Sequence, residues 1–180
     1  ITPKSIDVKA NLNQSKFYGD TDPELSYYTV GSLLSGDSFT GALSRTQGEN
    51  VGLYAINLGD LSAGSNYSIN FTSQNFEIKT KTIAIFPDDG QFKIYGNPDP
   101  VFTFTCDPPI ASWDSFAGAL SREVGEIPGT YLFTIGSLAL NSNYNIWFMT
   151  QNIEFTILQR DIVVTINPNQ HKTYGQPDPV

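Results

Sequence analysis

The chain has 180 residues, a formal net charge of −8 and a pI of about 4.4. An acidic surface repels phosphate backbones, so nucleic acid is not an expected partner. Cys106 is the one cysteine, which excludes an intramolecular disulfide framework, and no apolar run approaches the ~20 residues that a membrane-spanning helix needs.

A short motif, Tyr-Gly-x-x-Asp-Pro, occurs three times, at residues 18–23, 95–100 and 174–179. Its tyrosines, Tyr18, Tyr95 and Tyr174, are 77 and then 79 residues apart. A fixed period of this size indicates tandem domains. We predict repeat one at 1–82, repeat two at 83–161 and the start of a truncated repeat three at 162–180, and we expect the sequence to be a fragment of a longer array. We assign the two extra residues to the junction at 158–161.

Alternating apolar residues predict that most of each repeat is β-strand. In repeat one the pattern covers Ile6 to Ala10, a segment that enters Tyr18, and stretches near residues 25–30, 54–58, 67–71 and 76–78. The turn at 11–15 predicts that the first two strands form a hairpin. The link at 79–82 has no glycine or proline, so we expect a stiff connection between repeats. The pattern recurs at 162–166, and we expect this strand to extend the last strand of repeat two.

Residues 36–45 carry the one helical pattern of the repeat. Phe39, Ala42 and Leu43 stand at i, i+3 and i+4, and Asp37 or Ser38 could cap the first turn. The same spacing recurs at 116, 119 and 120. We therefore predict a β-rich α+β class, with one short helix lying on the sheet.

Carboxylates of the repeated corner are the candidate metal ligands. Asp20, Asp22 and Asp99 could contribute to a cation site, with calcium as the ion. Position 20 becomes Asn97 and then Gln176, and no Asp-x-Asp-x-Asp-Gly loop is present, so a rigid turn held by the aspartate is favoured over a metal site.

Catalytic chemistry has no visible basis in the sequence. His171 is the one histidine, and its counterparts are Ser15 and Phe92. No Ser/His/Asp set, zinc-ligand spacing or glycine-rich phosphate loop occurs. We predict that the chain is not an enzyme and needs no cofactor. Arg45 and Glu49, and likewise residues 122 and 126, predict an ion pair that braces a loop.

Two tryptophans, Trp113 and Trp147, are the candidate ligand-binding residues. Their counterparts in repeat one are Gly36 and Asn70, so a site built on them would be special to repeat two. Buried aromatic side chains are the alternative, since large rings supply most of the core of a small domain.

Three segments together resemble the MBG family, YGX type: Tyr-Gly-x-x-Asp-Pro, Ser-Phe-x-Gly-Ala-Leu-Ser-Arg and Ser-Asn-Tyr-x-Ile-x-Phe. The resemblance implies tandem arrays in large secreted or outer-surface bacterial proteins, many of them adhesin-like. An extracellular or cell-surface location follows from it. It also implies small β-grasp-like domains, each a mixed sheet with one short helix; the alternative is an all-β Ig-like sandwich.

Two functions from different classes remain. The first is a stiff stalk or spacer, whose partners are the neighbouring repeats of the same chain. The second is an adhesive module that binds glycans or a host or cell surface through exposed aromatic side chains. A third reading, an array made rigid by calcium, predicts a melting temperature that rises with the ion.

Overall fold

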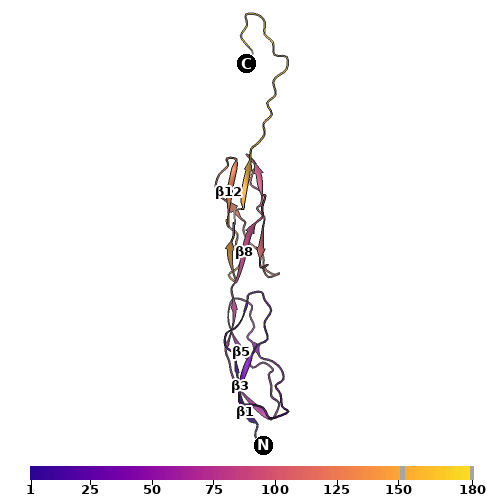
Figure 1. Ribbon diagram of the computed structural model, residues 1–180, viewed down its shortest axis with the longest axis vertical. Helices are drawn as coiled ribbons and strands as arrows, with labels where there is room; N and C mark the ends of the chain where they lie inside the picture. The colour runs from indigo at the N-terminus through magenta and orange to yellow at the C-terminus, as the bar shows by residue number, and fades with distance from the viewer. Residues whose placement is uncertain (151–152, 179–180) are drawn as a thin grey trace.

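The protein is described by a computed structural model that covers residues 1–150 and 153–178. Figure 1 shows an elongated molecule, in which two β-rich units follow one another and the last residues extend beyond the second unit. Repeat one contains β1 (Lys4–Ala10), β2 (Gln14–Phe17), β3 (Tyr27–Val30), β4 (Ser44–Arg45), β5 (Gly52–Asn57), β6 (Tyr67–Thr72) and β7 (Asn75–Lys79). Repeat two contains β8 (Lys81–Pro87), β9 (Phe92–Ile94), β10 (Phe104–Asp107), β11 (Ser121–Arg122), β12 (Gly129–Thr134), β13 (Tyr144–Phe148) and β14 (Glu154–Leu158).

Each repeat consists of two small sheets with the same topology. In repeat one, the first sheet has the order β3-β1-β6, with β1 antiparallel to β3 and parallel to β6. The second has the order β2-β7-β5-β4, with β2 parallel to β7 and β5 antiparallel to β7. Repeat two reproduces both sheets, as β10-β8-β13 and β9-β14-β12-β11.

The core of each repeat collects side chains from both sheets. Alternate residues of β1, including Val8 and Ala10, are buried, and so are Phe76 and Ile78 of β7. Phe155 in repeat two packs edge to face against Phe102 at a centroid distance of 5.1 Å. Because one face of each strand is buried and the other meets solvent, the period-2 pattern in the sequence predicts these strands correctly.

The predicted helix at 36–45, and with it the α+β class and the β-grasp-like fold, is wrong. No helix is present in residues 1–150 or 153–178; Thr40 instead bridges Ser62, and residues 44–45 form β4. Gly41 has φ +74°, and a Cβ there would collide with the carbonyl oxygen of Asp60. This left-handed residue in the middle of the segment ends any helical turn. The all-β alternative is consistent with the structure.

Three local predictions also fail. The first two strands do not form a hairpin, because β1 and β2 lie in different sheets. The two extra residues lie between β13 and β14 rather than at the junction, since Tyr54 pairs with Phe76 and Tyr131 with Phe155. Residues 162–166 form no strand and are exposed. Their equivalent, β8, is a strand because β10 and β13 flank it, and the described part of the chain offers residues 162–166 no such pair.

Candidate functional site

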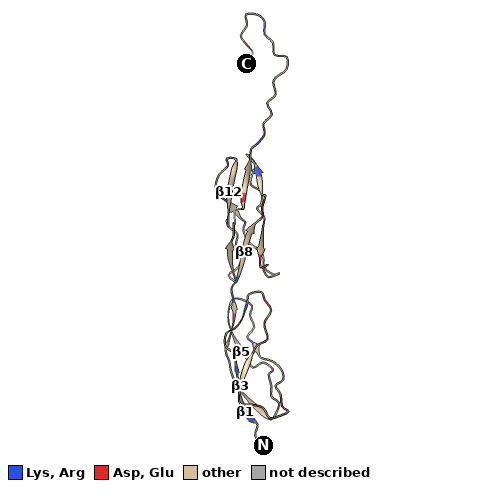
Figure 2. Ribbon diagram, in the orientation of Figure 1, with Lys and Arg blue, Asp and Glu red and all other residues tan. Residues whose placement is uncertain are grey.

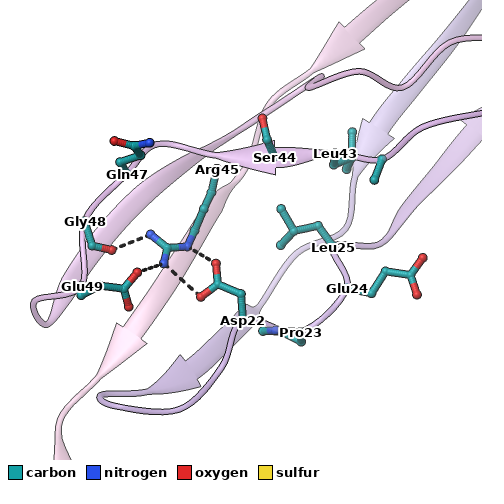
Figure 3. A pocket seen from close by; sticks show the side chains of 11 residues that line it. Asp22, Pro23, Glu24, Leu25, Leu43, Ser44, Arg45, Gln47, Gly48 and Glu49 are labelled. Carbon is teal, nitrogen blue, oxygen red and sulfur yellow. Dashed lines mark hydrogen bonds and ion pairs between the residues drawn. The ribbon is translucent and has the colours of Figure 1, made fainter. Parts of the chain in front are cut away.

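The Tyr-Gly-x-x-Asp-Pro corner of repeat one points two ways: Asp22 faces its own repeat, and Tyr18 faces repeat two. Asp22 accepts two hydrogen bonds from Arg45, 2.5 Å from Nε and 3.0 Å from Nη2. The same carboxylate lies 2.7 Å from Nζ of Lys16, and Glu49 bridges the two cations at 2.5 and 2.6 Å. Figure 3 shows Arg45 reaching from β4 toward Asp22 and the loop at 48–49.

Arg45 is the centre of this network. Its side chain is only 7% exposed and also donates to the carbonyl of Gly48 at 2.6 Å. Its guanidinium lies over the rings of Tyr54 and Phe76, 5.2 and 5.4 Å from their centroids. The planar guanidinium therefore joins the corner, the loop and the edge of the core, which a lysine could not do with the same geometry.

These contacts shift the ionisation of the acidic partners. Hydrogen bonds from Arg45, followed by those from Lys16, lower the pKa of Asp22 to about 2. The Lys16 ammonium lowers the pKa of Glu49 in the same way. Both carboxylates are thus held ionised and paired, so the network is a structural brace, and the predicted Arg45–Glu49 ion pair is confirmed.

Repeat two carries the same network. Asp99 accepts from Arg122 at 2.8 and 2.9 Å, and Lys93 lies 2.6 Å from the carboxylate of Asp99. Arg122 also pairs with Glu126 at 2.7 Å, as predicted. Beside each arginine lies a hollow, of about 670 Å³ in repeat one and about 300 Å³ in repeat two.

The candidate metal ligands lie in these ion pairs. Asp22 and Asp99 face arginine and lysine, and Asp20 pairs with Lys81 at 3.2 Å. Within the described residues, no group of three or more His, Cys, Asp or Glu side chains is arranged to hold a metal ion. A calcium ion at any of the three would have to replace a cation of the protein. Figure 2 shows the charged residues spread along both units rather than gathered in one patch.

The junction between the repeats is short and ordered. β7 ends at Lys79 and β8 begins at Lys81, so Thr80 alone separates them. Tyr18 is 5% exposed and packs edge to face against Tyr144 of repeat two, at a centroid distance of 5.1 Å. The indole N–H of Trp113 donates to the hydroxyl of Tyr18 at 3.3 Å.

A second, polar contact also joins the two repeats, and we call it the asparagine latch. Asn143 of repeat two is 7% exposed. Its side-chain oxygen accepts from the backbone N–H of Val51 at 2.8 Å, and its side-chain amide donates to Asn50 at 3.0 Å. Gly19, with φ +81°, lies so close to Ala111 that a Cβ would come within 3.2 Å of that methyl group. The glycine of the motif thus permits close approach of the two repeats.

The two tryptophans occupy different places. Trp113 lies at the junction, although its side chain is 67% exposed. Trp147 lies on β13, opposite Ala84 of β8, and is 60% exposed. The structure does not bring them into one site with a shared partner, and a ligand-binding role for either stays a prediction.

Sequence reasoning missed the residues that join the repeats. Tyr18, Asn143 and Tyr144 stand in segments that recur in both repeats, and this recurrence was the available signal. Among the described residues, no helix is long and apolar enough to cross a membrane.

Comparison with curated proteins yields no match to this chain. The MBG domain (YGX type) family matches residues 6–77 and again residues 83–155, one match for each set of seven strands. Together the two matches cover most of the sequence, and each contains one copy of the Tyr-Gly-x-x-Asp-Pro motif. The chain therefore belongs to the MBG domain (YGX type) family and contains two tandem copies of the domain.

Proposed function

We propose that this chain is a non-catalytic spacer, a stiff length of stalk in a large secreted or cell-surface bacterial protein of the adhesin type. The junction is the observation that carries the proposal. Thr80 is the whole linker, and aromatic, polar and ionic contacts join the repeats on either side of it. Such a junction leaves little freedom for one repeat to swing against the other.

The contacts across the junction are each modest. A hydrogen bond contributes about 1 kcal/mol and an aromatic pair about 0.5–1.5 kcal/mol. The exposed pair of Asp20 and Lys81 contributes about 0–1 kcal/mol. Because a one-residue linker makes docking intramolecular, little further entropy is lost on docking. Together these contacts suffice to hold the two repeats in line for nearly all of the time.

Residual dipolar couplings of the full chain test the proposal. If the repeats form one rod, the amides of both repeats report a single alignment tensor, and small-angle scattering gives the profile of an extended particle. The variant Tyr18→Ala with Asn143→Ala is expected to show two tensors of different magnitude. Two independent tensors in the unmutated chain would contradict the spacer.

A second candidate function, an adhesive module for glycans or a cell surface, has one observation in its favour. Trp147 is 60% exposed on β13, so its ring is accessible to a ligand. Saturable binding to a glycan array or to intact cells that is lost in Trp147→Ala would support this function. Asn70→Ala, at the equivalent site of repeat one, is the matched control. Binding unchanged by Trp147→Ala would remove the tryptophan from the proposal.

A further inference from the structure

Tyr18 docks on a group of residues in repeat two that we call the seat, and Tyr144 lies at its centre. The hydroxyl of Tyr144 accepts from the backbone N–H of Ala111 at 2.9 Å and donates to Asp114 at 2.9 Å. The carbonyl of the preceding residue, Asn143, accepts from the backbone N–H of Lys81 at 3.1 Å. These contacts fix the ring of Tyr144 and the side chain of Asn143 in the positions that meet repeat one.

The N-terminal end of repeat one carries the same construction. The hydroxyl of Tyr67 accepts from the backbone N–H of Leu34 at 2.8 Å and donates to Asp37 at 2.6 Å. The carbonyl of Asn66 accepts from the backbone N–H of Lys4 at 2.8 Å. Each of these three contacts in repeat two thus has an equivalent here. We call this set of five residues the N-terminal face.

This face is open where the seat of repeat two is filled. Asn66 is exposed and Tyr67 is half-buried, whereas Asn143 and Tyr144 are each 7% exposed. A hollow of about 360 Å³ lies against the face. All five residues of the face line this hollow.

We propose that the N-terminal face docks the C-terminal end of a further repeat that ends as repeat one does, through a new asparagine latch made by Asn66. The proposal rests on the spacer function and adds to it a statement of which repeat ends can dock on this face. The occupant must present a tyrosine and a glycine, as Tyr18 and Gly19 do. It must also present a polar side chain and a free backbone N–H, as Asn50 and Val51 do.

The end of repeat two does not meet this requirement. Ile127 stands in place of Asn50, and Pro128, which has no N–H, stands in place of Val51. Both hydrogen bonds of the latch are therefore unavailable at that end. Of the two repeat ends in this chain, the end of repeat one has the residues that fit the N-terminal face. Because that end is already docked on repeat two, the occupant is a further repeat with the same residues at its end.

Three differences at contact positions separate the face from the filled seat. Gly64 replaces Asn141, whose side-chain amide donates to Asp114 at 2.7 Å in repeat two. Leu34 replaces Ala111 and Gly36 replaces Trp113, so volume is gained at one position and lost at the other. A docked tyrosine would receive no indole hydrogen bond, and docking depends more heavily on Asn66.

The test is a full chain with repeat one duplicated, in which residues 1–80 precede Lys4 of the complete sequence. Hydrogen exchange of the Val51 amide is followed separately in the added copy and in the original. We expect exchange in the added copy to be about 10- to 30-fold slower than in the same chain carrying Asn66→Ala, because that substitution removes both hydrogen bonds of the latch. As a matched control, Asn50→Ile with Val51→Pro in the added copy reproduces the end of repeat two, and its repeats should align independently in residual dipolar couplings.

Equal exchange with and without Asn66, in a chain whose repeats are all folded, would overturn the proposal. The original copy separates this failure from failure of the spacer, because its Val51 amide reports the junction already present. If the duplicated chain does not fold, the seat can be transplanted. The 180-residue chain with Ala111→Leu, Trp113→Gly and Asn141→Gly carries the residues of repeat one at these three positions of the seat of repeat two. Retained protection of Val51 supports the proposal, and exchange as fast as in Asn143→Ala refutes it.

Discussion

Removal of the asparagine latch gives the sharpest prediction about the junction. Asn143→Ala deletes two hydrogen bonds, one to the Val51 N–H and one to Asn50. At about 1 kcal/mol each, the docked arrangement should lose about 2 kcal/mol. The backbone bonds of residue 143 remain, so repeat two should keep its fold. We expect the Val51 amide to exchange about 10- to 30-fold faster, since 1.4 kcal/mol corresponds to a factor of ten.

The equivalent change in repeat one supplies the control. Asn66 occupies the same position on its own repeat, but it is exposed and contacts no neighbouring repeat. Asn66→Ala should leave Val51 exchange unchanged and alter the free energy of unfolding by less than about 0.5 kcal/mol. Val51 exchange that is insensitive to Asn143→Ala, or equally sensitive to both changes, would refute the reasoning that the latch holds the repeats together.

Three further predictions concern stability within each repeat. Arg122→Lys loses the two-pronged contact with Asp99, and chemical denaturation of repeat two should show a loss of about 1–3 kcal/mol; a loss below about 0.5 kcal/mol would contradict the role given to the guanidinium. Because the pKa of Asp22 is lowered to about 2, its pairing stabilises the fold above the unfolded pKa of 3.8 and is lost as pH falls toward 2. The carboxylate is 38% exposed, so we expect about 1 kcal/mol in urea titrations between pH 5 and 2, removed by Asp22→Asn. Gly41→Ala should lower the melting temperature more than Gly64→Ala, since both have φ near +80° but only the first places a methyl group against a backbone carbonyl; equal losses would show that the contact with Asp60 is irrelevant.

The strands could be predicted because their pattern is local. Ile6, Val8 and Ala10 alternate in the sequence, and they are the buried residues of β1. The helix could not be rejected locally, because three apolar residues at i, i+3 and i+4 fit either one helical turn or an irregular turn. The bridge from Thr40 to Ser62 decides between the helix and the irregular turn, and the sequence of residues 38–45 alone does not predict this contact.

The same distinction applies to the site. The pairing of Arg45 with Glu49 could be predicted because Glu49 follows Arg45 closely in the sequence and both recur together in repeat two. Asp22 and Lys16, which complete the network, lie far from Arg45 in sequence, and nothing in the local pattern points to them. The contacts of Tyr18 and Asn143 join residues of different repeats, so the pattern within one repeat does not predict them.

The parallel strand pairs have a mechanical consequence. β1 carries the entry of the chain and pairs with β6 over six residues, from Lys4 with Tyr67 to Lys9 with Thr72. β7 carries the exit and pairs in parallel with β2. Both strands run along the long axis (Figure 1), so a pulling force applied at the two ends acts along them. The hydrogen bonds of each pair lie across that force and must break together under shear rather than one after another, so each repeat resists extension as a unit.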